Sequence, residues 1–210
     1  MRATAEFGEK AVIAVVEVAE PAVAPELART LGEAGIGALE ITVRTDGALE
    51  AIRAAVAEQA LPVGAGTIMS CEVADAVVEA GAGFLVSPAF DPLVSARCDE
   101  LGVALLPGAV TPTEVRHVRT AGFREVKIFP AQQFGGLALV NALAAVFPDM
   151  SFMPTGGVTH DGALDYLAHP QVAAVGGTWI APRELINARD WTEIGRRARA
   201  IVDALRDAEV

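Results

Sequence analysis

Short β-type runs alternate with alanine-rich helical stretches along almost the whole chain, and this alternation is the feature that most restricts the fold. The apolar runs recur roughly every 20 to 25 residues, and each is followed by a stretch with helical spacing. We expect eight strands, at residues 12–18, 38–43, 61–67, 84–89, 103–110, 125–130, 151–155 and 172–178. Such an alternation predicts an α/β protein with a parallel sheet covered by helices.

The number of repeated units favours a closed barrel. Helices are expected at residues 24–35, 47–59, 70–81, 111–122 and 190–208. Eight β–α units in 210 residues predict one (β/α)8 TIM-barrel domain over residues 1–210. It would have an N-terminal extension at about residues 1–10 and a closing C-terminal helix at about residues 190–208. The alternative is a doubly wound open sheet, but the first run continues into EVAEPAVAPE and not into a GxGxxG motif.

Composition excludes several classes of partner. Hydrophobic residues make up 52% of the chain and charged residues 20%, which is typical of a globular protein. The net charge of -11 argues against nucleic acid and anionic membranes as partners, although it allows a local pocket for a small anion. There is no apolar run of membrane-spanning length, no signal-peptide core and no CxxC pair. We therefore expect a cytoplasmic protein.

Polar side chains share one face of the second predicted strand. In LEITVRT, residues Glu40, Thr42 and Arg44 alternate with apolar residues, so they point into the barrel if the apolar residues pack under helices. A carboxylate and a guanidinium in that position are costly unless they are paired or functional. An internal salt bridge is the structural alternative to a catalytic role, and the two are compatible.

A lysine stands inside the apolar run EVKIFP. Lys127 shares a face with Glu125 and Phe129. An edge strand with a snorkelling lysine is the ordinary interpretation. The other interpretation is an amine that is desolvated so that it becomes a nucleophile. In a barrel, Lys127 and Glu40 converge from different strands, and the amine could attack a ketone to form a Schiff base while the carboxylate moves protons.

Glycine-rich segments end three of the predicted strands, at residues 64–67, 154–158 and 175–179. Loops after the seventh and eighth strands of this fold commonly hold a phosphate through backbone N–H groups. The candidates are Gly156, Gly157, Gly177 and Thr178. Ordinary turns also use glycine freely, so each pair alone is a weak signal.

The chain shows no pattern of metal ligands. His117, His160 and His169 lie within or beside helical stretches, without HxH or HExxH spacing. No GxSxG motif or Cys/His arrangement indicates an acyl-transfer nucleophile. We therefore expect no metal and no cofactor, with a covalent lysine Schiff base in their place.

These motifs, in this order, resemble those of the 2-keto-3-deoxy-6-phosphogluconate aldolase and 4-hydroxy-2-oxoglutarate aldolase family. The likeness is carried by LEITVRT, VGAGTI, LLPGAVTPTE, VKIFPA, FMPTGGV and VGGTW, and it extends from about residue 10 to about residue 205. The resemblance implies a class I aldolase, a carbon–carbon lyase on a (β/α)8 barrel. It also implies a small-molecule 2-keto acid substrate, no metal and a homotrimer.

The resemblance assigns a role to each candidate residue. Lys127 would form the Schiff base, and Glu40 would be the general acid/base. Arg44 and Thr67 would hold the pyruvate carboxylate. The remaining assignments are Pro88 and Phe129 as pocket walls, Thr155 beside the Schiff base, and Gly156, Gly157, Gly177 and Thr178 at the substrate phosphate.

Two segments depart from the family pattern. Glu17 stands near the end of the first predicted strand, where some relatives carry a basic residue, and its charge could repel an anion. Gln132 and Gln133 follow the lysine strand and could alter selectivity for the aldehyde half.

The predicted reaction is reversible cleavage of a 2-keto-3-deoxy sugar acid phosphate, such as 2-keto-3-deoxy-6-phosphogluconate. The products would be pyruvate and an aldehyde such as glyceraldehyde 3-phosphate. One alternative is the same chemistry on 4-hydroxy-2-oxoglutarate or another non-phosphorylated 2-keto acid. Further alternatives are a sugar-phosphate isomerase or epimerase and a non-catalytic sugar-phosphate-binding protein.

Overall fold

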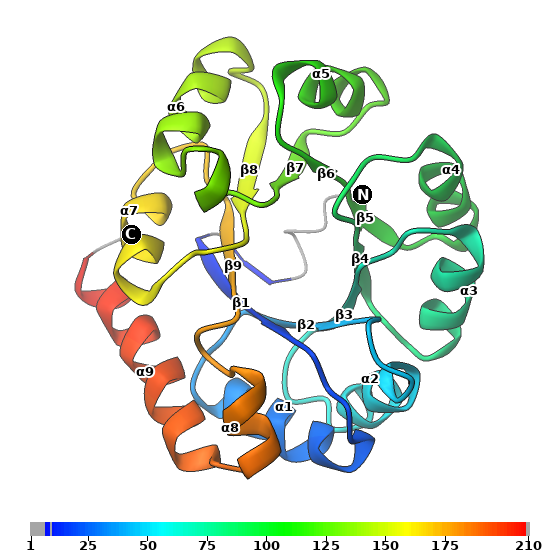
Figure 1. The fold of residues 1–210 in the computed structure, drawn as a ribbon, viewed down its shortest axis with the longest axis vertical. Coiled ribbons are helices and arrows are strands. Elements are labelled where there is room, and N and C mark those ends of the chain that lie inside the picture. Colours follow the sequence, from blue (N-terminus) through cyan, green and yellow to red (C-terminus); the bar gives the residue numbers. More distant parts are fainter. Residues whose placement is uncertain (1–6, 9, 209–210) are drawn as a thin grey trace.

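The computed structural model describes residues 7–8 and 10–208, and its strands curve around a common axis with the helices outside them (Figure 1). The strands are β1 (Ala11–Val16), β2 (Ala38–Thr42), β3 (Val63–Gly66), β4 (Phe84–Val86), β5 (Ala104–Leu106), β6 (Gly108–Ala109), β7 (Glu125–Ile128), β8 (Ser151–Pro154) and β9 (Ala174–Gly177). One sheet has the order β5-β4-β3-β2-β1-β9 and the other the order β6-β7-β8, and all their pairings are parallel. The predicted parallel, helix-covered α/β architecture is confirmed.

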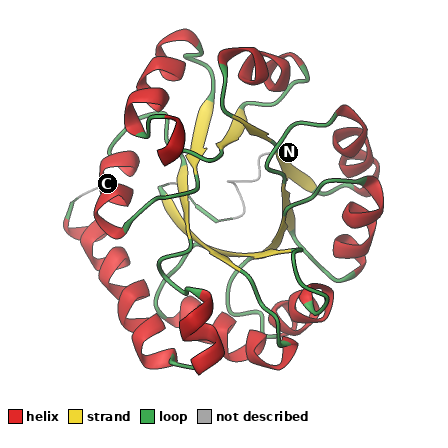
Figure 2. Ribbon diagram, viewed as in Figure 1, coloured by secondary structure: helices red, strands yellow, loops and turns green. Residues whose placement is uncertain are grey.

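Helices fill the connections between strands and cover the outer faces of the sheets (Figure 2). They are α1 (Ala24–Glu33), α2 (Ala48–Ala57), α3 (Cys71–Glu79), α4 (Pro92–Leu101), α5 (Pro112–Thr120), α6 (Leu137–Val146), α7 (His160–Leu167), α8 (Arg183–Ala188) and α9 (Trp191–Asp207). Short 3-10 turns lie at η2 (Pro21–Val23) and η3 (Gln132–Phe134). Local caps set several starts: Thr111 and Glu114 form a reciprocal capping box at α5, which satisfies backbone N–H groups of its first turn. The closing helix predicted at about 190–208 is α9.

The run predicted as one strand at 103–110 is two strands in the structure. Pro107 separates β5 from β6, because proline has no N–H to donate to a strand ladder. Its carbonyl accepts a hydrogen bond from the Lys127 backbone N at 2.9 Å. β5 pairs with β4 and β6 pairs with β7, so the chain passes from one sheet to the other at this residue. Isolated bridges also join the β8 and β9 segments.

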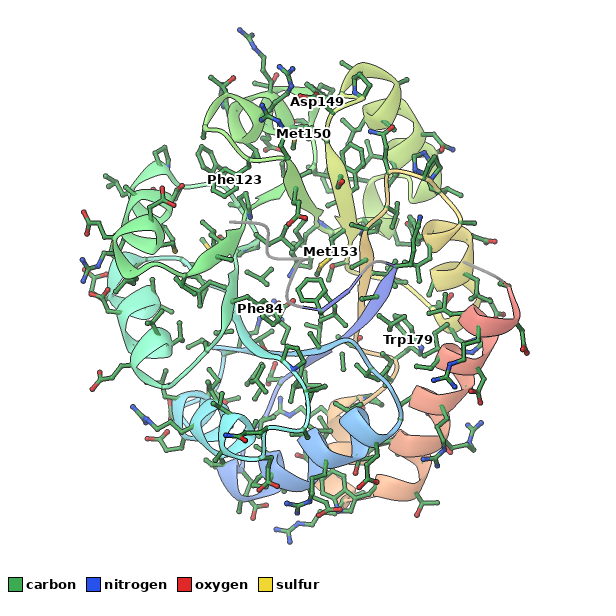
Figure 3. All side chains as sticks on the ribbon, turned by 180° about the vertical axis from the view of Figure 1, so that it is seen from behind. Phe84, Phe123, Asp149, Met150, Met153 and Trp179 are labelled. Carbon is green, nitrogen blue, oxygen red and sulfur yellow. The ribbon has the colours of Figure 1, made fainter. Side chains whose placement is uncertain are left out.

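Alternate residues of the strands build two separate apolar layers. Val12 and Ile41 pack in the larger cluster with the helices, whereas Ile13, Phe84 and Met153 belong to an interior cluster. Figure 3 shows Phe84 and Met153 toward the middle of the molecule. Most of the extension predicted at residues 1–10 lies outside the described residues, but Phe7 packs its ring 5.3 Å from that of Phe84.

Within residues 7–8 and 10–208, no helix combines the length and apolar character needed to cross a membrane.

Candidate active site

A cavity of about 330 Å³ lies at the carboxyl ends of the strands. Its lining includes every residue that the sequence predicted for the site: Glu40, Arg44, Thr67, Pro88, Lys127, Phe129, Thr155, Gly156, Gly157, Gly177 and Thr178. These residues come from strands or strand ends that are far apart in the chain. The carboxyl edge of parallel strands is the usual place for an active site in this class of fold.

Lys127 and Glu40 form a buried pair inside the ring of strands. Lys127 lies on β7 in register with Gly108 and Met153 of the neighbouring strands. Its Nζ donates a hydrogen bond to Glu40 Oε1 at 3.1 Å, and the two side chains are 6% and 0% exposed. The interpretation as a snorkelling lysine on an edge strand is therefore wrong. Strand β7 pairs with β6 on one side and β8 on the other, and the Lys127 amine is buried. Glu40 is in an internal ion pair, but its partner is Lys127; among the described residues the Arg44 side chain contacts Thr67 and forms no ion pair with Glu40. A catalytic role stays open.

Polar atoms in the cavity have unused hydrogen-bonding capacity. Glu40 Oε2 and Thr155 Oγ1 are buried and have no hydrogen-bond partner among the described residues. A buried polar atom without a partner costs free energy, so both atoms favour a polar ligand group in the cavity. The Phe129 ring centroid lies 5.4 Å from Lys127 Nζ, within cation–π reach.

Two glycines make room for these side chains, and sequence reasoning gave neither of them this role. A Cβ on Gly66 would lie 2.1 Å from Glu40 Oε1, and one on Gly176 would lie 2.5 Å from Thr155 Oγ1. A signal for Gly66 was available. Strand alternation places Gly64 and Gly66 on the inner face of β3, and a strand with glycine at both inner positions leaves space for its neighbours.

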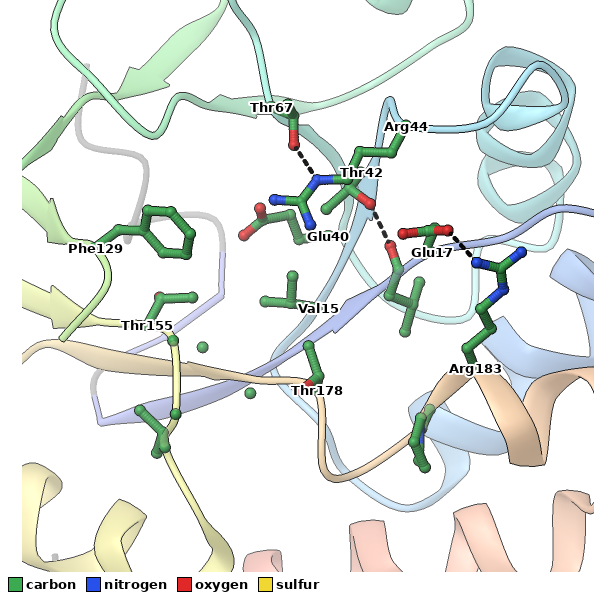
Figure 4. A pocket seen from close by; sticks show the side chains of 18 of the residues that line it. Val15, Glu17, Glu40, Thr42, Arg44, Thr67, Phe129, Thr155, Thr178 and Arg183 are labelled. Carbon is green, nitrogen blue, oxygen red and sulfur yellow. Dashed lines mark hydrogen bonds and ion pairs between the residues drawn. The ribbon is translucent and has the colours of Figure 1, made fainter. Parts of the chain in front are cut away.

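Arg44 and Thr67 meet at the cavity wall. Arg44 Nε donates to Thr67 Oγ1 at 3.3 Å, and Figure 4 shows this pair beside Glu40, with Phe129 and Thr155 on the other side of the pocket. Thr67 has a φ of 68°, a left-handed conformation that is unfavourable for a β-branched residue. Backbone strain of this kind clusters at functional sites.

The segment after β8 forms a loop with left-handed backbone at Gly156 and Gly157, whose φ values are 94° and 73°. Gln132 of η3 supports this loop: its backbone N donates to the Gly156 carbonyl at 3.1 Å. A Cβ on Gly157 would lie 2.6 Å from the Gln132 Cβ. Gln132 is therefore a packing partner of the predicted phosphate loop.

Gly177 has a different reason to be glycine. It is the last residue of β9, not part of a loop, and a Cβ there would lie 1.5 Å from the Trp179 ring. Packing alone therefore requires glycine at this position. Thr178, which follows, is exposed at the rim of the cavity.

The rim also carries a cation that sequence reasoning missed. Arg183, the first residue of α8, donates from Nη1 to Glu17 Oε1 at 2.9 Å (Figure 4). Both residues and Glu184 line the cavity. In the sequence, Arg183 follows the glycine-rich segment at residues 175–179 closely, which could have placed it near the rim. No sequence pattern indicated its contact with Glu17.

Among residues 7–8 and 10–208, no group of three or more His, Cys, Asp or Glu side chains is placed to hold a metal ion.

A parallel α/β fold with a buried amine and carboxylate at the strand ends defines an enzyme suited to covalent lysine chemistry. Residues 4–197 match the aldolase family described as KDPG and KHG aldolase. The chain belongs to this family, so it is an aldolase, a lyase of carbon–carbon bonds. The resemblance read from its motifs is confirmed.

The similarity to known proteins extends over nearly the whole chain. It is 41% identical to a 2-dehydro-3-deoxy-phosphogluconate aldolase of Treponema pallidum over 185 residues, which is 87% of this chain and 88% of the relative. A KDPG aldolase from Legionella pneumophila, with pyruvate captured as a covalent carbinolamine, has a TM-score of 0.91, 33% identity and coverage of 96% of this chain and 98% of its own. The enzyme of Zymomonas mobilis ZM4, solved with 3-phosphoglycerate, has a TM-score of 0.88 and 33% identity, and the match covers 94% of this chain and 92% of that chain.

Proposed function

We propose that this aldolase is a class I enzyme that reversibly cleaves 2-keto-3-deoxy-6-phosphogluconate to pyruvate and glyceraldehyde 3-phosphate through a Schiff base on Lys127. The observation that carries this proposal is the pair of Lys127 Nζ and Glu40 Oε1, buried 3.1 Å apart in the cavity. The covalent pyruvate adduct of the Legionella relative supports the same chemistry here.

The pair can perform each proton transfer of the cleavage. Glu40 takes a proton from Lys127, and the free amine attacks the C2 keto carbon. The carbonyl oxygen gains one proton from the attacking nitrogen to give the carbinolamine, and Glu40 returns its own proton to that hydroxyl as water leaves and the iminium forms. It then accepts the C4 hydroxyl proton while the C3–C4 bond breaks, and the bonding electrons move into the iminium to give an enamine. After the aldehyde departs, Glu40 protonates C3, and water hydrolyses the imine to release pyruvate and restore the lysine.

The keto-acid end of the substrate lies between the Arg44 side and the Phe129 side of the pocket. Arg44 and Thr67 bind the carboxylate, since their donors meet at the wall beside Glu40. Pro88 and Phe129 form apolar walls, and the unpartnered Thr155 hydroxyl lies beside the Schiff base.

The phosphate end lies against Gly156, Gly157, Gly177 and Thr178. Gly156 and Gly157 have left-handed backbone, which lets their N–H groups approach an oxyanion without a Cβ in the way and supports their part in this placement. Thr178→Val is the suitable test of this site, because any substitution of Gly177 would also displace the Trp179 ring.

Borohydride reduction in the presence of pyruvate tests the proposed chemistry. It should add a stable mass to the EVKIFP peptide, and Lys127→Ala should abolish the label. Lys10 is the only other lysine in the chain, and its Nζ donates to the Leu167 and His169 carbonyls, so Lys10→Gln is a matched control that should leave the label unchanged. Labelling of Lys10 alone, or of neither lysine, would refute the mechanism.

A second candidate substrate is 4-hydroxy-2-oxoglutarate or another 2-keto acid without phosphate. It is favoured by the carboxylates of Glu17 and Glu184 at the rim, which oppose a dianion. The comparison of kcat/KM for a phosphorylated substrate and its dephospho analogue separates the two. A preference above roughly 100-fold would support a dedicated phosphate site.

We also propose that residues 1–210 form one domain and that the two sheets are the wall of one closed (β/α)8 barrel, with β5 and β6 as a single interrupted strand. The bridges between the β8 and β9 segments support closure on one side, and the continuous chain through Pro107 supports it on the other. The family resemblance supports a homotrimer, for which light scattering should give a mass of three times 21.7 kDa. A cytoplasmic location stays a prediction.

A further inference from the structure

The cavity has a charged end that the aldol chemistry does not use. Glu17 and Arg183 form their 2.9 Å ion pair on the side of the pocket away from Phe129 and Thr155 (Figure 4). Thr178 lies between these two sides in the same view. A substrate fixed at Lys127 would therefore extend its far end toward the Glu17–Arg183 pair.

The balance of charge at this end does not suit a phosphate in the resting enzyme. Arg183 contributes one positive charge, and Glu17 and Glu184 contribute one negative charge each, so the local sum is -1. A phosphate monoester carries about -1.5 to -2 at neutral pH. Besides the donors proposed at the glycine segments and Thr178, the cationic side chain at this end is the Arg183 guanidinium, whose planar donors match oxyanions, but its Nη1 already donates to Glu17. A phosphate must therefore compete with Glu17 for the same cation.

We propose that Glu17 is a specificity-determining residue that limits binding of phosphorylated substrates by holding Arg183. An anionic far end has to displace or share the Glu17 contact. A substrate with an uncharged far end does not need Arg183, so the Glu17–Arg183 ion pair does not affect the binding of such a substrate. This inference rests on the proposed function, because the position of the substrate is set by its bond to Lys127.

The test is the ratio of kcat/KM for 2-keto-3-deoxy-6-phosphogluconate to that for 2-keto-3-deoxygluconate. Glu17→Gln should raise this ratio by about fivefold, the upper end for an exposed ion pair, and Arg183→Gln should lower it by a similar factor. Both changes should lie in KM and not in kcat, because neither group touches the reacting atoms. The Glu20–Arg189 pair, 2.7 Å apart and outside the cavity lining, supplies matched controls. Glu20→Gln and Arg189→Gln should leave the ratio unchanged.

An unchanged or lowered ratio in Glu17→Gln would overturn the proposal, because the carboxylate would then not compete with the phosphate. An unchanged ratio in Arg183→Gln would overturn it as well, because the cation would then have no part in selectivity. Borohydride trapping with pyruvate separates this outcome from failure of the proposed function. Trapping on Lys127 should equal the wild type in all four variants, and its absence in the wild type would refute the imine mechanism itself.

Discussion

The Lys127 amine and the Glu40 carboxylate meet at 3.1 Å although 87 residues separate them in the chain. Burial of two charges costs several kcal/mol per ion, which a single hydrogen bond offsets only in part. The second carboxylate oxygen, Glu40 Oε2, has no partner in the described part of the chain. These observations support the proposed exchange of a proton with a ligand more than they support a stabilising role for the pair.

Glu40→Gln should reduce kcat by about 100-fold or more, the usual range for loss of a general acid/base. The amide keeps the shape of the side chain but cannot take the C4 hydroxyl proton. Borohydride trapping with pyruvate should still label Lys127, and the midpoint of urea unfolding should show that the variant is folded. Near-normal turnover would assign Glu40 to packing alone.

Gly66→Ala should impair turnover far more than it impairs folding. The added Cβ would lie 2.1 Å from Glu40 Oε1 and would push the carboxylate from its position beside Lys127. Overpacking of this kind costs about 1–3 kcal/mol, whereas a displaced catalytic group costs about 100-fold in rate. Gly83→Ala is the matched control, since its Cβ would meet only the Val63 carbonyl at 3.6 Å. Equal kcat values for the two variants would contradict this role of Gly66.

The two cysteines should differ in reactivity. Burial raises the pKa of the Cys98 thiol to about 11, and the residue is 1% exposed, whereas Cys71 is partly exposed at the start of α3. Iodoacetamide at pH 8 should therefore modify Cys71 and leave Cys98 unmodified in the folded protein. Peptide mass mapping reads the result, and alkylation of Cys98 at the same rate as Cys71 would show that the helix α4 opens.

The same pKa shift predicts a loss of stability at high pH. A Cys98 thiol ionises near its ordinary pKa of 9.0 when unfolded and near 11 when folded, so between these values the folded state binds more protons. The free energy of unfolding should therefore fall by about 3 kcal/mol from below pH 9 to above pH 11. Urea unfolding at several pH values measures this fall, and Cys98→Ala should show a smaller one. Identical pH profiles for the two proteins would exclude Cys98 as the cause.

Chelators should leave turnover unchanged, since the proposed mechanism takes its electron sink from the lysine imine. Dialysis against EDTA, followed by a pyruvate-release assay, measures this. Lost activity that returns with a divalent cation would contradict the expectation of a metal-free reaction.

Local sequence was sufficient for the parallel α/β architecture and for the inward orientation of Glu40 and Lys127, both of which line the cavity. Strand alternation acts over two residues and put Glu40 and Lys127 on inner faces without any knowledge of their partners. The cap at Thr111 and Glu114 acts over three residues and fixed the start of α5. Pro107 is also a local signal for a break in a strand. Because the residues on both sides of it are apolar, the run at 103–110 was nevertheless predicted as one strand.

The sequence by itself determined which side chains are hidden and which chemistry they can carry, because alternation, caps and apolar spacing are local properties of the backbone. Only the tertiary structure decided which of them touch. Curvature and register of the sheets bring Glu40 to Lys127 and Glu17 to Arg183. These contacts depend on how distant strands are ordered around the common axis. The periodicities of strands (two residues) and helices (three to four residues) are local and do not specify that order.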